Sequence, residues 1–221
     1  MSDSRVLLLD LDGTLVDTLP DLQAVANELL AELGADSLSA EEIRGMVGDG
    51  ALKLLERALA ARSVHPRDIQ PLLARFLERY EARPALLSRP YPGVPEVLRQ
   101  VTGSGWRCAL VTNKPLRAAR RLLQALDLDE FFSVAIGGDS LPVRKPDPGP
   151  LFAALAALDA TPAQAVAVGD HANDLRAAAS AGVPVVFARY GYGVLPPEVT
   201  FDAAIDAFTE LPRRLAALRP G

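Results

Sequence analysis

Cysteine is nearly absent from this chain of 221 residues. Cys108 is the single one, so no disulfide can form within the chain. It stands in the apolar stretch 108–111, and a cysteine in such a stretch is most simply a small core residue. A nucleophilic role would need a neighbouring base, and nothing local ties His65 or His171, the only histidines, to it. The sequence therefore favours neither cysteine nor disulfide chemistry.

An excess of basic residues is also missing. Lysine and arginine total 23 against 28 aspartates and glutamates, which gives a formal net charge of −5. A general nucleic-acid binder needs a basic face for its phosphate contacts, so nucleic acid is excluded as a general partner. A small anionic substrate remains compatible with this charge, because a site can be locally positive inside an acidic protein.

Long hydrophobic runs are lacking too. No uninterrupted apolar stretch reaches the length that a membrane-spanning helix requires. Residues 1–5 lead directly into a strand-like segment and do not form the pattern of a signal peptide. We therefore expect no membrane partner and a cytoplasmic location.

Lysine is scarce. The chain has three lysines, Lys53, Lys114 and Lys145, and twenty arginines. The lysine ammonium is a compact point charge, whereas the arginine guanidinium is a wide fork. Since this chain uses arginine for generic positive charge, each lysine deserves a local explanation.

What the sequence does contain is an alternation of short apolar runs and helical patterns. Hydrophobic residues make up 49 % of the chain, enough for a sizeable core. Runs typical of buried parallel strands occupy 6–9, 109–111, 134–136, 165–168, 185–187 and, more weakly, 203–205. Helical patterns between them occupy 116–126, 149–158 and 174–181. This alternation predicts an α/β fold: a doubly wound parallel sheet, or Rossmann-like core.

The stretch from about 19 to 88 breaks this alternation, because it contains no convincing strand. Four helices are predicted there: 21–33, one that begins at the capping box of Ser39 and Glu42, 50–61, and 66–80 with Pro66 in its first turn. We therefore predict two domains. Residues 1–18 and 89–221 form the α/β core, and residues 19–88 form an inserted helical cap with hinges near 16–20 and 88–92.

Four polar clusters stand at predicted strand ends or helix starts. In open α/β sheets, ligands bind outside the carboxyl ends of the strands. Any one cluster alone would be a common turn or helix cap, but capping does not readily explain four of them in order. The clusters are Asp10-Leu11-Asp12-Gly13-Thr14, Thr112-Asn113, Lys145, and Gly169-Asp170 with Asn173-Asp174.

These residue types together supply what phosphoryl transfer requires, which is mainly positioning and charge neutralisation around one nucleophile. A carboxylate can attack phosphorus to form an acyl phosphate. A second carboxyl can protonate the leaving alkoxide and then deprotonate the attacking water. Carboxylates can also hold a hard divalent cation, while a hydroxyl, a backbone N–H and an ammonium bind the phosphate oxygens.

The motifs resemble those of the haloacid dehalogenase superfamily. Asp10-Leu11-Asp12-Gly13-Thr14-Leu15 is similar to its first motif, and Thr112, Lys145 and Gly169-Asp170 with Asp174 are similar to its second, third and fourth motifs, in the right order. The resemblance implies that Asp10 is the nucleophile and that the helical insert is a cap that selects the substrate.

The resemblance also implies the other roles at the site. Asp12 is implied as the general acid and base, and the cofactor is implied to be Mg²⁺. The implied metal residues are Asp10, Asp12 through its backbone carbonyl, Asp170 and, in a supporting role, Asp174. The implied phosphate-binding residues are Thr112, Asn113 through its backbone, and Lys145.

Within the superfamily, Asp12 favours a phosphatase or phosphomutase, because true dehalogenases lack a carboxylate there. The strings 48–50, 138–142, 145–148 and 190–193 resemble those of bacterial phosphoglycolate phosphatases. Two residues depart from that pattern. Asp49 stands where that family often has Asn, and His171 stands where it often has Ser. We expect His171 to lie beside the metal rather than to ligate it.

The substrate that this resemblance implies, 2-phosphoglycolate, carries a carboxylate that needs a positive partner. Lys53 and Arg44 are the candidates in the cap, together with the free backbone N–H groups that follow Gly50 at a helix start. Asp49 would repel the substrate unless it turns away or pairs with Arg44. The candidate substrate-binding residues are Asn113, Arg44, Lys53 and Gly50.

Functions of two other classes fit the sequence less well. A phosphorylation-dependent receiver domain would have neither Asp12 nor a helical insert of this size. A catalytically inactive binding module has no support, because all four motifs are intact. A phosphosugar phosphatase, a pyrophosphatase and a β-phosphoglucomutase-like mutase stay open as alternatives, as does the choice between monomer and dimer.

Overall fold

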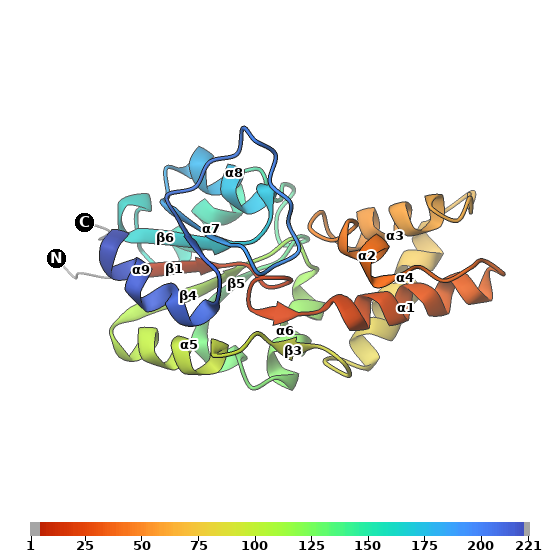
Figure 1. Cartoon of the computed structure of the whole chain (residues 1–221), viewed down its shortest axis with the longest axis horizontal. Coiled ribbons are helices and arrows are strands. Elements are labelled where there is room, and N and C mark those ends of the chain that lie inside the picture. Colours follow the sequence, from red (N-terminus) through yellow and green to blue (C-terminus); the bar gives the residue numbers. More distant parts are fainter. Residues whose placement is uncertain (1–4, 219–221) are drawn as a thin grey trace.

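The computed structural model describes residues 5–218 (Figure 1). Residues 1–4, on which the expectation of no signal peptide partly rests, and residues 219–221 lie outside the described part. Six parallel strands form one sheet in the order β5-β4-β1-β6-β7-β8, which confirms the predicted α/β fold. The strands are β1 (Arg5–Leu9), β4 (Trp106–Val111), β5 (Phe132–Ile136), β6 (Ala165–Gly169), β7 (Val185–Ala188) and β8 (Ala203–Ile205).

Helices cover both faces of this sheet. Leu7 and Leu9 of β1 belong to a core shared with α5, α6 and α9, whereas Val6 and Leu8 belong to a second core shared with α7 and α8. Because both faces of the central strands are buried, residues 6–9 and 165–168 form continuous apolar runs, as parallel strands usually do. The helices are α5 (Val94–Gly103), α6 (Leu116–Ala125), α7 (Gly149–Ala157), α8 (Ala172–Ala181) and α9 (Leu211–Leu218), with short 3-10 helices η1 (Asp129–Phe131), η2 (Pro162–Gln164) and η3 (Phe208–Glu210).

Four further helices lie together beyond one end of the sheet, on the right in Figure 1. They have a hydrophobic core of their own, in which Leu29, Leu55 and Phe76 are fully buried. The predicted capping box is confirmed: Glu42 N donates to Ser39 Oγ at 3.2 Å, and Ser39 N donates to the Glu42 carboxylate at 2.8 Å. These helices are α1 (Leu19–Glu32), α2 (Ala40–Arg44), α3 (Ala51–Ala60) and α4 (Gln70–Ala82).

The start of α4 differs from the prediction. The helix begins at Gln70 rather than at Pro66, and Pro71 occupies its first turn. The Asp68 carboxylate accepts a hydrogen bond from Gln70 N at 2.9 Å, so a side chain satisfies this N–H at the true helix start. A proline fits the first turn of a helix at either place, which is why the sequence pattern did not locate the start.

The chain crosses between the sheet and the four helices through a small second sheet. Strands β2 (Val16–Asp17) and β3 (Arg89–Pro90) pair antiparallel. Next to them, the Asp21 carboxylate of α1 accepts hydrogen bonds from Ser88 N at 2.9 Å and Ser88 Oγ at 2.6 Å. The outgoing and returning segments are thus joined, although strands of two residues are too short to leave a sequence pattern.

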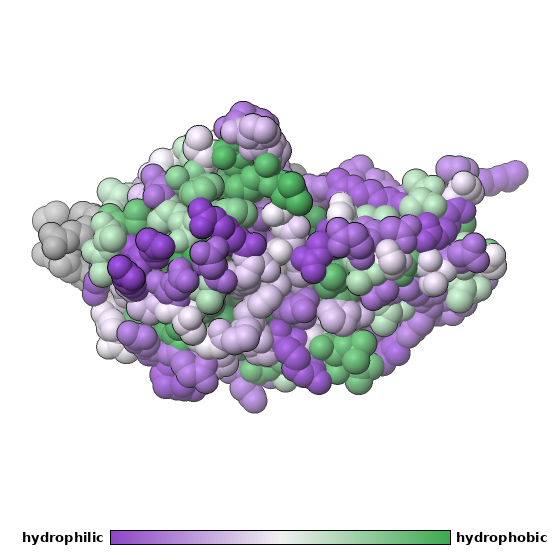
Figure 2. Space-filling view, in the orientation of Figure 1, coloured by the Kyte–Doolittle hydropathy of each residue, from purple (hydrophilic) through white to green (hydrophobic). Residues whose placement is uncertain are grey.

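The surface of the four-helix part is mostly hydrophilic on the face shown in Figure 2. Arg75 of α4 pairs with Glu32 of α1, and Arg83, the residue directly after α4, pairs with Glu28 of α1, so ion pairs link the two longest helices of this part at their exposed sides. Within residues 5–218, no helix is both long and apolar enough to cross a membrane.

Candidate active site

The polar motifs meet at the carboxyl end of the sheet, where it faces the four helices. Parallel strands end at the same edge, so the loops after β1, β4 and β6 are brought together there. One pocket is lined by these loops and by α1, α3 and α4. The predicted residues that line it are Asp10, Asp12, Gly50, Thr112, Asn113, Lys145, Asp170 and Asp174.

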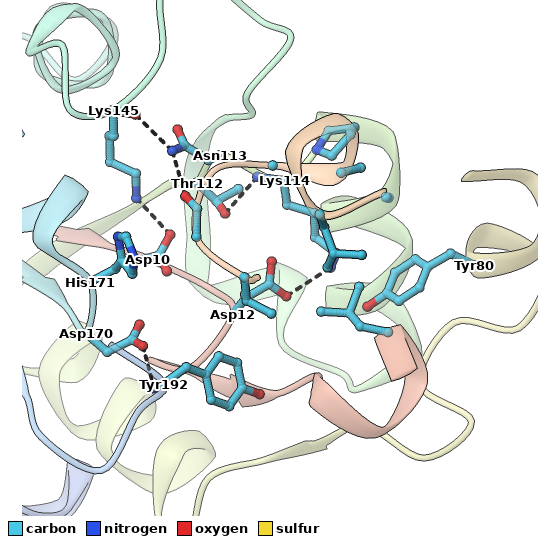
Figure 3. A pocket seen from close by; sticks show the side chains of 18 of the residues that line it. Asp10, Asp12, Tyr80, Thr112, Asn113, Lys114, Lys145, Asp170, His171 and Tyr192 are labelled. Atoms are coloured by element: carbon cyan, nitrogen blue, oxygen red, sulfur yellow. Dashed lines mark hydrogen bonds and ion pairs between the residues drawn. The ribbon is translucent and has the colours of Figure 1, made fainter. Parts of the chain in front are cut away.

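Asp10 is held by the buried ammonium of Lys145. Lys145 Nζ donates to Asp10 Oδ1 at 2.7 Å (Figure 3). It also donates to Asp174 Oδ1 and to the Val111 carbonyl, both at 2.5 Å. Burial raises the pKa of Asp10 to about 7, although the charge of Lys145 acts in the opposite direction. The lysine fixes one oxygen of the carboxylate, as the positioning of a nucleophile requires.

Three carboxylates converge beside this lysine. Asp10, Asp170 and Asp174 are all buried, and each offers an oxygen that lies within 4.8 Å of the others. Burial, together with the charges of Asp10 and Asp174, raises the pKa of Asp170 to about 8. A bound cation would relieve this repulsion, and an all-oxygen set suits a hard divalent ion. The residues present therefore fit a divalent metal.

Asp170 is anchored from two sides. Thr14 Oγ1 donates to Asp170 Oδ1 at 2.8 Å, and Tyr192 N donates to Asp170 Oδ2 at 2.7 Å. Gly13 lies against the same carboxylate with a φ of 87°, and a Cβ at this position would collide with Asp170. The turn after β1 therefore needs glycine both for its backbone conformation and for space.

Asp12 has a partner outside the four motifs. Lys114 Nζ donates to Asp12 Oδ1 at 2.9 Å, and the Lys114 side chain is only 5 % exposed. Burial acts to lower the pKa of Lys114, but the neighbouring Asp12 and Tyr80 raise it above its ordinary value. The signal in the sequence was the scarcity of lysine, combined with the place of Lys114 directly after Thr112-Asn113.

Asn113 links the core to the helical part. Its side-chain amide donates to the carbonyls of Gly48 and Lys145, both at 2.9 Å. Thr112 Oγ1 accepts a hydrogen bond from Lys114 N at 3.2 Å, which shapes the loop after β4. Of the three residues expected to bind phosphate, Asn113 thus bonds both to Lys145 and to the loop before α3.

Lys53 and Arg44 are not brought to the pocket. Lys53 Nζ pairs with Glu56 at 2.6 Å on the outside of α3, and its side chain is 46 % exposed. Arg44 Nη1 donates to the Gly191 carbonyl at 3.3 Å, and its guanidinium stacks over the Tyr192 ring. Neither side chain is among those that line the pocket.

Asp49 turns away from the pocket. It pairs with Arg57 rather than with Arg44, and it accepts a hydrogen bond from Asn173 at 2.7 Å. Burial acts to raise the pKa of Asp49, but the hydrogen bonds from Asn173 and Arg57 lower it overall. The carboxylate is therefore engaged between α3 and α8, which removes the expected repulsion of an anionic substrate.

His171 caps α8 and contacts the helical part. Its Nδ1 accepts a hydrogen bond from Asn173 N at 3.3 Å, and its ring also lines the pocket. Gly48 approaches this ring so closely that a Cβ on Gly48 would lie 2.8 Å from the imidazole. The φ of Gly48 is 114°, a region that residues with a side chain rarely adopt.

We predict that Gly48→Ala weakens the contact between the helical part and the core at the pocket. Backbone strain of this kind costs about 1–3 kcal/mol, and a misplaced loop lowers the rate by loss of positioning. We expect kcat/KM for an aryl phosphate to fall by roughly tenfold, while circular dichroism shows a folded protein.

Gly45→Ala is the matched control. Gly45 has an ordinary φ of −69°, and a Cβ there would meet only the Glu42 carbonyl at 3.7 Å. The double variant Gly48→Ala/His171→Ser removes the imidazole and keeps a capping side chain, so it should recover part of the rate. Equal kcat/KM for the Gly48 and Gly45 variants would contradict this account.

A parallel α/β core that carries a cluster of buried aspartates at its carboxyl edge, beside four helices inserted after the first strand, defines the class of this protein. Residues 5–182 match the family model of the haloacid dehalogenase-like hydrolases. The chain belongs to this family, as its motifs predicted, and it is an enzyme of the phosphoric monoester hydrolase class.

Relatives of known name support this assignment. The chain is 41 % identical over 218 residues to phosphoglycolate phosphatase of Cereibacter sphaeroides, which covers 96 % of this chain and 99 % of the relative. It is 40 % identical over 220 residues to phosphoglycolate phosphatase of Caulobacter vibrioides, which covers 98 % and 92 %.

Solved structures show the same architecture. A predicted phosphoglycolate phosphatase from Haemophilus somnus superposes with a TM-score of 0.91 and 32 % identity over 97 % of this chain and 99 % of that one. CbbY from Rhodobacter sphaeroides, in complex with phosphate, superposes with a TM-score of 0.82 and 30 % identity over 94 % and 96 %.

Proposed function

We propose that this enzyme is a Mg²⁺-dependent phosphatase that hydrolyses 2-phosphoglycolate to glycolate and phosphate through an aspartyl-phosphate. The observation that carries the proposal is the buried Asp10, held by Lys145 at 2.7 Å beside Asp170 and Asp174. Relatives about 40 % identical along almost the whole chain bear the name phosphoglycolate phosphatase, which supports the substrate.

In the first step, a carboxylate oxygen of Asp10 attacks phosphorus. The new O–P bond forms as the bond from phosphorus to the ester oxygen breaks, and Asp12 gives its proton to the leaving alkoxide. Glycolate leaves, and Asp10 carries the phosphoryl group as an acyl phosphate.

In the second step, water attacks the same phosphorus. Asp12, now a carboxylate, takes a proton from the water, and the bond between Asp10 and phosphorus breaks to release phosphate. Lys145 and the loop of Thr112 and Asn113 would bind the phosphoryl oxygens. The metal would be held by Asp10, Asp170, Asp174 and the backbone carbonyl of Asp12, and when bound it neutralises phosphate charge.

We further propose that residues 19–88 act as a cap. The joined crossings at β2 and β3, near the expected hinges 16–20 and 88–92, support a movement of the four helices as one unit. Closure would exclude bulk water from the pocket while Asp10 attacks phosphorus. A cytoplasmic location is also part of the proposal, since the single cysteine forms no disulfide within the chain.

The alternatives concern the substrate. A mutant of CbbY from Rhodobacter sphaeroides, 29 % identical to this chain, was solved in complex with xylulose-(1,5)bisphosphate, which favours a phosphosugar as the second candidate. Pyrophosphate hydrolysis and a β-phosphoglucomutase-like transfer remain as further alternatives.

A substrate panel tests the proposal. We expect 2-phosphoglycolate to give the highest kcat/KM among 2-phosphoglycolate, ethyl phosphate, a sugar phosphate, pyrophosphate and an aryl phosphate, and only when Mg²⁺ is added. A higher kcat/KM for the sugar phosphate would replace the substrate assignment. Full activity on the aryl phosphate in excess EDTA would overturn the metal dependence.

A further inference from the structure

One buried cation in the pocket has no function in the proposed reaction. Among the described residues that line the pocket, the lysines are Lys114 and Lys145, and no arginine is present. Lys145 serves Asp10 and Asp174. Lys114 is also buried. Burial of an ammonium costs free energy of desolvation, which only a well-placed partner offsets.

Tyr80 of α4 lies beside Lys114. The Lys114 ammonium sits 4.3 Å from the centroid of the Tyr80 ring, and the ring projects from α4 toward Asp12 and Lys114 (Figure 3). Tyr80 is only 4 % exposed, yet its hydroxyl has no hydrogen-bond partner within the described residues. A buried phenol normally has such a partner. The Tyr80 hydroxyl is therefore available to donate a hydrogen bond to a bound ligand.

The surroundings of these two donors are apolar. Leu22 of α1, Leu54 of α3, and Phe76 and Leu77 of α4 line the pocket on the side of the helical part. An ammonium and a phenol in such a setting match one compact monoanion. A second phosphate would bring about two negative charges against one ammonium, and the hydroxyls of a sugar would find few partners among these walls.

The position of Lys114 also fixes where that anion would lie. In the proposed reaction, Asp12 contacts the ester oxygen of the substrate, and Lys114 Nζ is 2.9 Å from Asp12 Oδ1. The ammonium is therefore next to the group that protonates the leaving oxygen. In 2-phosphoglycolate, the carboxylate is attached to the carbon that bears this oxygen.

We propose that Lys114 and Tyr80 form the carboxylate subsite of the substrate pocket, an inference that rests on the proposed function and assigns its specificity to residues outside the four motifs. In this structure, the ammonium donates to Asp12 and lies beside the Tyr80 ring. A substrate carboxylate shares the ammonium and accepts from the Tyr80 hydroxyl, so the same lysine orients both the acid and the substrate.

The test compares two substrates that differ only in the group at issue. 2-Phosphoglycolate and ethyl phosphate have the same two-carbon skeleton, with a carboxylate in one and a methyl in the other. The ratio of their kcat/KM values is measured for the wild type, Lys114→Met, Tyr80→Phe and Lys53→Met. Lys53 pairs with Glu56 outside the pocket, so Lys53→Met is the matched control.

Lys114→Met should lower this ratio by roughly tenfold to a hundredfold, the size of a lost hydrogen bond to a charged group. Tyr80→Phe should lower it severalfold while the thermal midpoint stays unchanged or rises, because the phenol oxygen has no partner to lose. Lys53→Met should leave the ratio unchanged.

Three outcomes would count against these assignments, and they are distinguishable. Equal losses on both substrates in Lys114→Met would make Lys114 a positioning residue for Asp12 and overturn the subsite. If that variant does not fold, an unchanged ratio in Tyr80→Phe overturns it instead. A wild type that hydrolyses the aryl phosphate but does not prefer 2-phosphoglycolate would overturn the proposed substrate, and that result precedes any variant.

Discussion

Asp10→Asn is expected to reduce turnover by on the order of 10⁴-fold or more, as the loss of a covalent nucleophile does in other hydrolases. The amide has nearly the shape of the carboxylate but does not attack phosphorus. The fold should survive, because Lys145 keeps its bonds to Asp174 and to the Val111 carbonyl. The measurement is steady-state hydrolysis of an aryl phosphate, with circular dichroism as the check on folding.

Asp10→Ala serves as the second variant, since an asparagine can deamidate back to aspartate and alanine cannot. Both variants should fail to form a phosphorylated protein after rapid acid quench, whereas the wild type should label at Asp10. A pure variant that keeps more than a small fraction of the wild-type rate would exclude Asp10 as the nucleophile.

Asp170→Asn is expected to have the second largest effect, through the metal. The carboxylate is a proposed ligand, and it accepts hydrogen bonds from the Thr14 hydroxyl and from the backbone N–H groups of Tyr192 and Gly193. We expect the Mg²⁺ concentration for half-maximal activity to rise more than the approximately 10–100-fold that is typical when a supporting partner of a metal is lost. Titration of activity with Mg²⁺ measures this shift.

Asp174→Asn is the comparison, because Asp174 also receives a hydrogen bond from Lys145 and from His171 N. Its loss should raise the Mg²⁺ requirement by about 10–100-fold, less than the loss of Asp170. Binding of Mn²⁺, followed by electron paramagnetic resonance, gives a readout that does not depend on turnover. A larger shift for Asp174→Asn than for Asp170→Asn would reverse the roles of the two carboxylates.

The sheet could be predicted because its central strands, such as β1, β6 and β7, are buried on both faces. Runs such as 165–168 contain no polar residue, so a single sequence is enough to predict them as buried strands. The strands in turn predicted that the motif residues lie close together, because the carboxyl ends of parallel strands lie at one edge of the sheet. β2 and β3 left no such pattern, because two residues carry no periodicity.

The side of the pocket that the helices form could not be predicted in the same way. Whether a lysine on a helix faces inward depends on how the helices pack, and Lys53 turned outward to Glu56. Lys114 and Tyr80 are far apart in the sequence and meet only because α4 packs over the loop after β4. The scarcity of lysine marked Lys114 as unusual, but the identity of its neighbours required the structure.

The order of pairing around β1 has a consequence for folding during synthesis. Leu7 pairs with Cys108 on one side and with Val166 on the other, so the strand that carries Asp10 emerges from the ribosome long before either partner exists. The four helices, in contrast, are contiguous in the chain and have their own core, and such local structure forms early. We therefore expect helices α1 to α4, which are expected to select the substrate, to fold first. Strand β1, which precedes Asp10, stays unpaired until β4 and β6 have been synthesised.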